Sequence, residues 1–188
     1  IGEGYDLGIR IGTPQDSNLI ARPLAKIGLV IVASPDFLEK HGVPQTIEDL
    51  ADLPAVTYAG ANRTSNQIHY YDANGEERSQ QMRSVFRSNE GETLIEAAKA
   101  GQGYAVVGCF MLGNEVACGH LVPILTDVKL TDFIGDAYII YPHRDLPVRT
   151  RLFIETLQNM IGEPPVWERN IADCECPFEI VAKRKQAC

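Results

Sequence analysis

The stretch FRSNEGETLIEAAKAGQGYAVVG, residues 86–108, decides the fold class because it contains a helix followed closely by a strand. Asn89 and Glu92 match the capping-box pattern at the start of the helix. The apolar positions on one face of the helix are Leu94, Ile95, Ala97 and Ala98. Gly101 is placed to end the helix in the left-handed conformation, and the apolar run YAVVG after it is typical of a buried strand.

The glycines of this stretch match a dinucleotide-binding fingerprint only in part. Gly101, Gly103 and Gly108 are present, but Val106 stands where the third glycine of G-x-G-x-x-G belongs. The fingerprint also requires a strand before the glycines and a helix after them, so that phosphates meet the helix N-terminus. Here the helix comes first. Order and spacing therefore both argue against a nucleotide site.

The start of the same helix, residues 88–91, offers backbone N–H groups and the positive end of the helix dipole. Such a terminus binds an anionic group when it opens into a cleft. Alternatively, Asn89 and Glu92 satisfy these N–H groups as a capping box, and the terminus holds no ligand. The residues alone leave both alternatives open.

Outward from this stretch, strands and helices alternate along the chain. YDLGIRI, residues 5–11, alternates polar and apolar residues, and KIGLVIVA, residues 26–33, is nearly all apolar; both patterns indicate strands. Ser34 is the expected N-cap of a helix in SPDFLEKHG. The pair Asn74 and Gly75, between two strand-like runs, predicts a hairpin.

The second half of the chain continues the alternation. CFMLGNEVACG, residues 109–119, predicts a short helix, and DAYIIYP, residues 136–142, predicts a strand. LPVRTRLFIETLQNMIG, residues 146–162, predicts an amphipathic helix. Beyond it the pattern is lost, and we expect an irregular tail over residues 163–188. This order predicts an α/β fold with a mostly parallel sheet.

Composition limits the partners of this chain. Its 188 residues suffice for one globular domain, with room for two lobes. Acidic residues outnumber basic ones 25 to 17, so the chain has no basic face for DNA phosphates. No apolar run approaches the roughly 20 residues of a membrane helix. We therefore expect neither nucleic-acid binding by this piece nor a membrane span.

Cysteine and histidine patterns favour neither a metal site nor an enzyme. The five cysteines are odd in number and dispersed, which fits a reducing compartment. CEC, residues 174–176, could ligate a metal together with Cys188, but it lacks the CxxC spacing and a neighbouring histidine, so we expect free thiols and no metal. The sequence contains no G-x-S-x-G, H-E-x-x-H or P-loop motif. We expect no catalytic residues and no cofactor.

Five stretches carry a family resemblance: YDLGIRIGTPQDSNLIARPLA, LVIVASPDFLEKHGVPQTIEDLADLP, SNEGETLIEAAKAGQGYAVVG, GHLVPIL and YIIYPHRDLPVRTRLFIETL. Together they span residues 5–162 and resemble the effector-binding domain of the LysR-type transcriptional regulators. The second stretch is the most distinctive, and the order of all five argues against chance.

The resemblance implies an α/β, two-lobed, periplasmic-binding-protein-like (type 2) fold with two crossover strands and a ligand cleft between the lobes. Residues 1–25 would be part of lobe I and residues 26–136 lobe II. Residues 137–162 would return to lobe I as its last strand and helix, before the tail at 163–188. It also implies a winged helix-turn-helix, a linker helix and the first strand–helix–strand of lobe I before Ile1. We therefore expect the fold to be incomplete at its N-terminal edge.

The resemblance also implies three walls for the effector, each in a loop at the carboxyl end of a strand. In chain order the ligand-binding walls are Gly12, Thr13 and Pro14; Ser88, Asn89 and Glu90; and Gly108, Cys109 and Phe110. If Glu90 faces the cleft, the effector is neutral, amino-bearing or cationic; if it faces water, it only favours the helix dipole. Cys109 is either a redox-sensing thiol or a small buried side chain, and we expect the latter.

We therefore expect the sensor half of a LysR-type regulator, not an enzyme. A small-molecule effector would bind between the lobes and control DNA binding by the winged helix-turn-helix outside this chain. The full-length protein would be a cytoplasmic homo-oligomer that touches DNA only through that missing domain and has no membrane contact. The alternatives are a stand-alone solute-binding receptor of the same fold, which would carry a secretion signal, and an enzyme on this scaffold, which would turn over its ligand.

Overall fold

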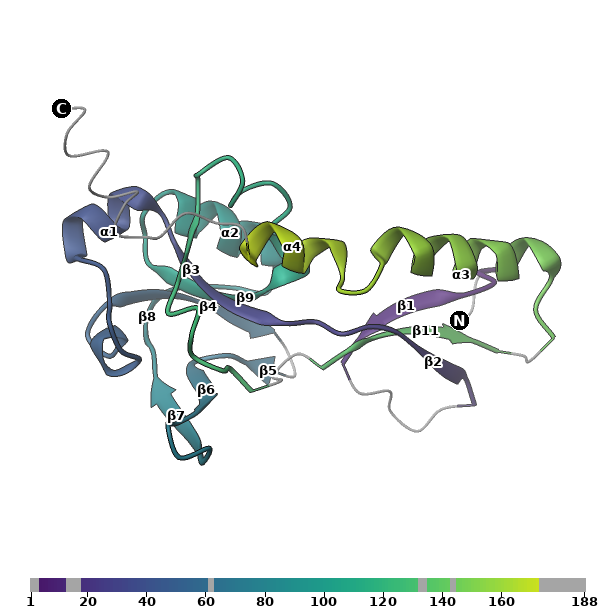
Figure 1. Cartoon of the computed structure of the whole chain (residues 1–188), viewed down its shortest axis with the longest axis horizontal. Helices are drawn as coiled ribbons and strands as arrows, with labels where there is room; N and C mark the ends of the chain where they lie inside the picture. Colours follow the sequence, from purple (N-terminus) through teal and green to yellow (C-terminus); the bar gives the residue numbers. More distant parts are fainter. Residues whose placement is uncertain (1–3, 13–17, 61–62, 132–134, 143–144, 173–188) are drawn as a thin grey trace.

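Two sheets organise the chain in the computed structural model, which describes residues 4–12, 18–60, 63–131, 135–142 and 145–172. Figure 1 shows them at opposite ends of an elongated molecule. We call the smaller sheet and the helix that covers it lobe I, and the larger sheet with its helices lobe II. The division of the chain at residues 25/26 and 136/137 stays a prediction.

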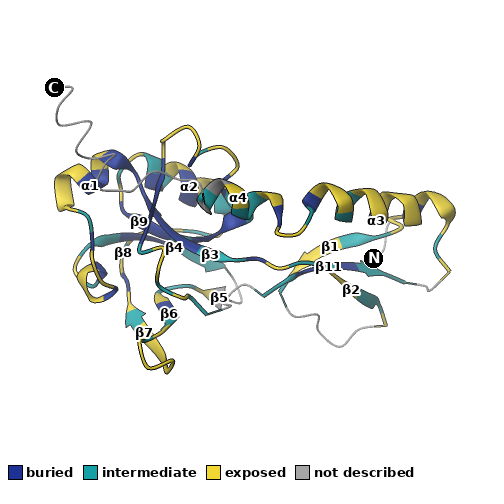
Figure 2. Cartoon of the chain, in the orientation of Figure 1, coloured by how far each residue is buried: buried dark blue, intermediate teal, exposed yellow. Residues whose placement is uncertain are grey.

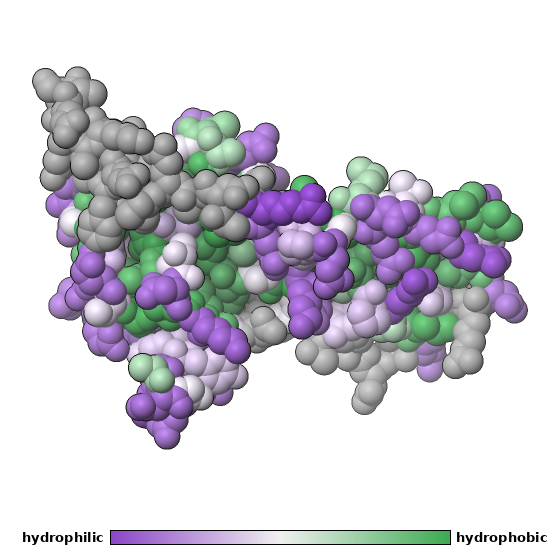
Figure 3. All heavy atoms as spheres, in the orientation of Figure 1, coloured by the Kyte–Doolittle hydropathy of each residue, from purple (hydrophilic) through white to green (hydrophobic). Residues whose placement is uncertain are grey.

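Lobe I is a three-stranded antiparallel sheet in the order β1-β11-β2. Its elements are β1 (Gly8–Ile11), β2 (Ile20–Ala25), β11 (Ala137–Tyr141) and α3 (Val148–Ile161). Helix α3 lies over the sheet (Figure 1) and buries Thr150, Ile154 and Ile161. Figure 3 shows apolar side chains at the outer end of this lobe, and Val148 and Leu152 on α3 are exposed.

Lobe II is a six-stranded sheet in the order β10-β3-β9-β4-β5, with β8 also paired to β4. Its strands are β3 (Leu29–Ala33), β4 (Pro54–Gly60), β5 (Arg63–Thr64), β8 (Arg83–Ser88), β9 (Tyr104–Gly108) and β10 (Val122–Ile124). Its helical elements are α1 (Pro35–His41), α2 (Gly91–Lys99), and the short 3-10 turns η1 (Glu48–Leu50) and η2 (Cys109–Met111). A separate antiparallel hairpin joins β6 (Gln67–Tyr71) and β7 (Glu77–Gln81).

Both faces of the larger sheet are buried, because successive residues of a strand point to opposite faces. On β3, Val30 and Val32 belong to one apolar cluster. Ile31 and Ala33, which alternate with them, belong to the other. Figure 2 shows the resulting layer of buried strands, with the exposed residues gathered on the helices and hairpin outside it.

The sheet of lobe II is mixed, so the expectation of a mostly parallel sheet is wrong. Strand β4 runs parallel to β8 and β9, which α2 connects. Strand β3 is antiparallel to both β9 and β10. The alternation of strands and helices predicts parallel pairing only where a helix links two strands of one sheet. Strand β3 instead enters lobe II directly from β2 of lobe I.

Two local predictions are confirmed and one holds only in part. The Ser34 hydroxyl accepts a hydrogen bond from the Phe37 N–H (3.2 Å) at the start of α1. Gly75 has φ +79° in the turn between β6 and β7, as the hairpin signal predicts. Of the short helix expected over residues 109–119, only η2 is helical and turns follow it.

The expectation of an irregular tail is wrong for its first part. Helix α4 (Val166–Ala172) follows α3 after a short turn, while residues 173–188, with CEC and Cys188, lie outside the described residues. Figure 1 shows α4 continuing from α3 toward lobe II. This segment has no long apolar repeat, and its helix forms where Trp167 and Ile171 pack on the second apolar cluster of lobe II.

Candidate functional site

The second and third expected walls lie at the same edge of the larger sheet. Ser88, the last residue of β8, is in register with Tyr58 of β4, and β9 also runs parallel to β4. The carboxyl ends of these strands therefore share one edge. The Met111 side chain of η2 contacts Gly91 at the start of α2 so closely that a side chain at Gly91 would clash. The loops at residues 88–90 and 108–110 are thus neighbours.

The start of α2 is not closed by the expected capping box. The N-cap residue is Glu90, one position after Asn89, and its side chain makes no capping hydrogen bond. Instead the Glu90 N–H donates to the Ser88 hydroxyl (3.0 Å) and the Glu90 carbonyl accepts from the Leu94 N–H (3.3 Å). The side chains of Asn89 and Glu90 are exposed. The first turn of α2 therefore has no side-chain cap, and Met111 lies against its Gly91.

The first expected wall is described only at Gly12, because Thr13 and Pro14 lie outside the described residues. Gly12 has φ +96°, and its N–H donates to the carbonyl of Asp136 (3.0 Å). Asp136 directly precedes β11, in the second segment that crosses between the lobes. The first wall is thereby attached to a crossover segment.

The third wall is attached to the other crossover segment. The Cys109 N–H donates to the carbonyl of Gly28 (2.9 Å), which lies between β2 and β3. A Cβ at Gly28 would lie 3.4 Å from Cys109 Sγ and 3.3 Å from Glu168 Oε1 of α4. The crossover, the third wall and α4 therefore converge at Gly28.

The three glycines near α2 each have a structural role. Gly101 has φ +71° and ends α2 in the left-handed conformation, as predicted. A Cβ at Gly103 would lie 2.7 Å from the backbone oxygen of Pro54, so β9 approaches β4 there without room for a side chain. A Cβ at Gly108 would lie 2.6 Å from the Phe110 ring. None of these roles involves a phosphate.

A cleft of about 570 Å³ opens beside the crossover segments, and we call it the hinge cleft. It is lined by the end of β2 with Lys26, by Asp136, by residues 162–165, and by Glu168. Its volume suits a small metabolite. The sequence expectation did not include these lining residues. None of the described residues of the three expected walls lines this cleft. Gly12 is hydrogen-bonded to the backbone of Asp136, and Cys109 lies near Glu168, both of which line it.

Helix α4 covers the third wall. The ring of Trp167 meets the ring of Phe110 edge-on, with centroids 6.5 Å apart. Trp167 Nε1 is buried, and no acceptor among the described residues lies within hydrogen-bonding distance of it. An unpaired buried donor of this kind costs about 1–3 kcal/mol. Trp167 and Glu168 of α4 therefore lie against residues of the third expected wall.

Cys109 is a buried, unreactive thiol in this arrangement. Burial, and next the charge of nearby Glu168, raise the pKa of Cys109 to about 11. The thiolate is the reactive form of cysteine, so a protonated buried thiol is a poor redox sensor. The structure supports the expectation of a small buried side chain.

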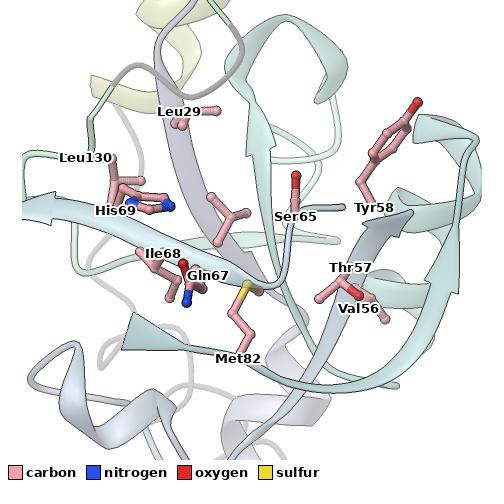
Figure 4. A pocket seen from close by; sticks show the side chains of 11 residues that line it. Leu29, Val56, Thr57, Tyr58, Ser65, Gln67, Ile68, His69, Met82 and Leu130 are labelled. Carbon is pink, nitrogen blue, oxygen red and sulfur yellow. The ribbon is translucent and has the colours of Figure 1, made fainter. Parts of the chain in front are cut away.

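Two other cavities lie within lobe II. Figure 4 shows the smaller, lined among others by Thr57, Gln67 and Met82; its volume of about 10 Å³ holds roughly one water molecule and no metabolite. The larger, about 750 Å³, lies between η1, the turn after β6 and residues 127–129, and includes Ala73. Neither cavity is lined by residues of the three expected walls that the structure describes.

Within the described ranges, no three His, Cys, Asp or Glu side chains are grouped to hold a metal ion. Over the same residues, no helix combines the length and apolarity needed to cross a membrane.

One family model matches most of this chain, and several known proteins are similar to it. The family model described as LysR substrate binding domain matches residues 1–161, which end at the last residue of α3. Helix α4 lies beyond the matched region.

Individual relatives agree with the family match. An uncharacterized HTH-type transcriptional regulator of Haemophilus influenzae is 34% identical over 151 residues, covering 79% of this chain and 51% of the relative. The regulatory domain of CrgA from Neisseria meningitidis has a TM-score of 0.70 at 29% identity, over 84% of this chain and 76% of that one. The regulatory domain of AphB from Vibrio vulnificus has a TM-score of 0.65 at 30% identity, over 81% of this chain and 74% of that one. The chain spans about half the length of the curated relatives it matches.

Proposed function

Because the chain belongs to the LysR substrate-binding-domain family, we propose that it senses a small metabolite for a transcriptional regulator and binds it at the hinge cleft. The cleft beside the crossover segments is the observation that carries this proposal. A ligand there would contact β2 of lobe I, both crossover segments and α4, which packs on lobe II. It would shift the arrangement of the lobes if it has different affinities for two arrangements.

We extend the proposal to the full-length protein. The lobe shift would reposition winged helix-turn-helix domains outside this chain, in a cytoplasmic homo-oligomer on DNA. The names of the relatives support DNA-bound regulation, since they are HTH-type transcriptional regulators. The exposed apolar side chains Val148 and Leu152 on α3 support self-association, because apolar surface of this kind often marks a protein interface.

The charge of the cleft favours an uncharged or amino-bearing effector. Three carboxylates, Asp136, Glu163 and Glu168, line it against the single ammonium of Lys26. A dicarboxylate would meet net repulsion there. Glu90 is an exposed acidic residue, so it supplies no positive charge that would favour an anionic effector.

A thermal-shift screen of small metabolites on the 188-residue chain tests the proposal, followed by calorimetry on each hit. Ala25→Trp fills the hinge cleft and should abolish the shift. Ala73→Trp fills the larger cavity of lobe II and serves as the matched control, which should keep it. If Ala73→Trp abolishes the shift and Ala25→Trp keeps it, the effector binds in the larger cavity of lobe II instead.

Two further measurements separate the alternatives. Mass spectrometry of the recovered ligand should find it unchanged, whereas turnover would indicate an enzyme. Sequencing the coding region before Ile1 should find a helix-turn-helix, whereas a secretion signal would indicate a solute receptor.

A further inference from the structure

We infer that helix α4 is a strap that ties lobe I to lobe II and covers the wall formed by Cys109 and Phe110. Lifting of α4 would expose the buried Cys109 and the part of Phe110 that Trp167 covers. The inference rests on the proposed function, because it concerns regulation of the same effector site.

The chain path makes α4 a link between the lobes. Helix α3 belongs to lobe I and ends at Ile161, and residues 162–165 lead directly into α4. The packing partners of α4 belong to lobe II, where Trp167 and Ile171 join the apolar cluster of β3, β9 and α2. Any rotation of the lobes about the crossover segments must therefore carry α4 along or detach it.

The docked face of α4 meets the residues expected to contact the effector. Trp167 lies edge-on against Phe110, and Glu168 Oε1 and Cys109 Sγ converge on Gly28. The strap also lines the hinge cleft through Pro164, Pro165 and Glu168. A ligand that reaches Cys109, or the part of Phe110 that Trp167 covers, has to displace these side chains.

Several features favour reversible docking. The strap is a single short helix of seven residues. Its Trp167 Nε1 is buried without an acceptor among the described residues, a cost that is relieved when the indole reaches water. The family match ends before α4, so the shared fold is defined without it. Short elements with few buried contacts open locally more readily than a sheet core.

Trp167 is the only tryptophan of the chain, so its fluorescence reports docking of the strap without any knowledge of the effector. Iodide quenching would be measured for the unchanged chain, for Ile171→Asp on the docked face and for Val166→Asp as matched control. Val166 is exposed on the same helix. Quenching should be at least about threefold weaker in the unchanged chain and in Val166→Asp than in Ile171→Asp. Equal quenching in all three would overturn the docked strap, and circular dichroism checks that each variant is folded.

Access to the wall would be read from Cys109 itself. In a chain with Cys118, Cys174, Cys176 and Cys188 changed to serine, Cys109 is the only thiol. Ellman's reagent, a small aromatic disulfide, then probes the path a ligand would take. Ile171→Asp should raise its rate of reaction with Cys109 at least about tenfold over Val166→Asp.

Equal rates in the two variants would overturn the strap. If metabolites bind in the thermal-shift screen while these rates are equal, the proposed function stands and the strap fails. If the rates differ while no metabolite binds, the strap is supported and the proposed effector site at the hinge cleft is contradicted.

Discussion

The indole of Trp167 lies edge-on to the ring of Phe110, at an interplanar angle of 71°. The two residues are far apart in sequence, and only Phe110 lies within the region that the family model matches. A contact between the shared sensor fold and a segment outside the match thus covers an expected effector wall. Edge-to-face geometry is the favourable one for such rings.

Gly103→Ala should destabilise the chain strongly, because the added Cβ would meet the backbone of Pro54 and Ala55 rather than a movable side chain. Overpacking of this kind costs about 1–3 kcal/mol, or about 2–10 °C in Tm. Thermal unfolding measures the loss. The matched control is Gly8→Ala, where the Cβ would meet only the Ile140 side chain at 3.4 Å; a similar loss there would contradict the explanation.

Thr57 and Ser84 should be energetically coupled. Thr57 is buried, and its Oγ1 lies 2.6 Å from Ser84 Oγ, joining β4 to β8 beside the expected effector edge. Thr57→Val should cost about 1–2 kcal/mol in the free energy of unfolding. A double-mutant cycle with Ser84→Ala should show a coupling of about 0.5–1.5 kcal/mol. Purely additive losses would rule out a stabilising hydroxyl pair.

Glu115 should stabilise the folded chain only at pH values above the range in which its carboxyl group titrates. Its pKa is lowered, first by the hydrogen bond to His120 and also by Lys99. The distances from Glu115 Oε2 are 2.7 Å to His120 Nδ1 and 3.2 Å to Lys99 Nζ. A carboxyl whose pKa is lower in the folded chain than in the unfolded chain stabilises the fold at pH values above its unfolded pKa. That stabilisation is lost as the pH falls through its folded pKa.

Glu115→Gln should therefore lower Tm by about 1–3 °C at pH 7. The difference in Tm from the unchanged chain should shrink as the pH falls below the ordinary glutamate value of 4.5 and through the lowered pKa of the folded carboxyl. Scanning calorimetry across this pH range measures both. Glu155→Gln, at an exposed glutamate on α3, is the matched control. A Tm difference for Glu115→Gln that does not shrink as the pH is lowered would show that the side chain acts by packing instead of charge.

Lys26→Gln should change effector affinity in a direction that reveals the charge of the effector. Lys26 supplies the only ammonium among the residues that line the hinge cleft. For an amino-bearing metabolite from the screen, the change should tighten binding about 3–10-fold, since it removes a repulsion. Weaker binding of an amino-bearing metabolite would contradict this charge argument. Lys40→Gln, at an exposed lysine on α1, should leave the affinity unchanged.

Local features of the chain could be predicted wherever one backbone rule decides them. Ser34 caps α1, Gly75 turns the hairpin and Gly101 ends α2, because cap and turn geometry depends on neighbouring residues alone. The capping box at Asn89 failed, since the Ser88 hydroxyl took the Glu90 N–H and moved the helix start. Which of these neighbouring groups forms the hydrogen bond depends on how the chain leaves β8 and enters the loop before α2.

From the sequence alone we could predict that residues 26–33 form a buried strand, that strands alternate with helices in an α/β fold, and which family the chain resembles. Those follow from periodicity and from residues adjacent in the chain. Other relationships became visible in the folded chain alone: β3 runs antiparallel to β9, Lys26 and Asp136 line one cleft, and Trp167 of α4 packs against Phe110. These relationships join segments far apart in sequence, and the short helix α4 forms where lobe II offers an apolar surface to cover, which no local pattern encodes.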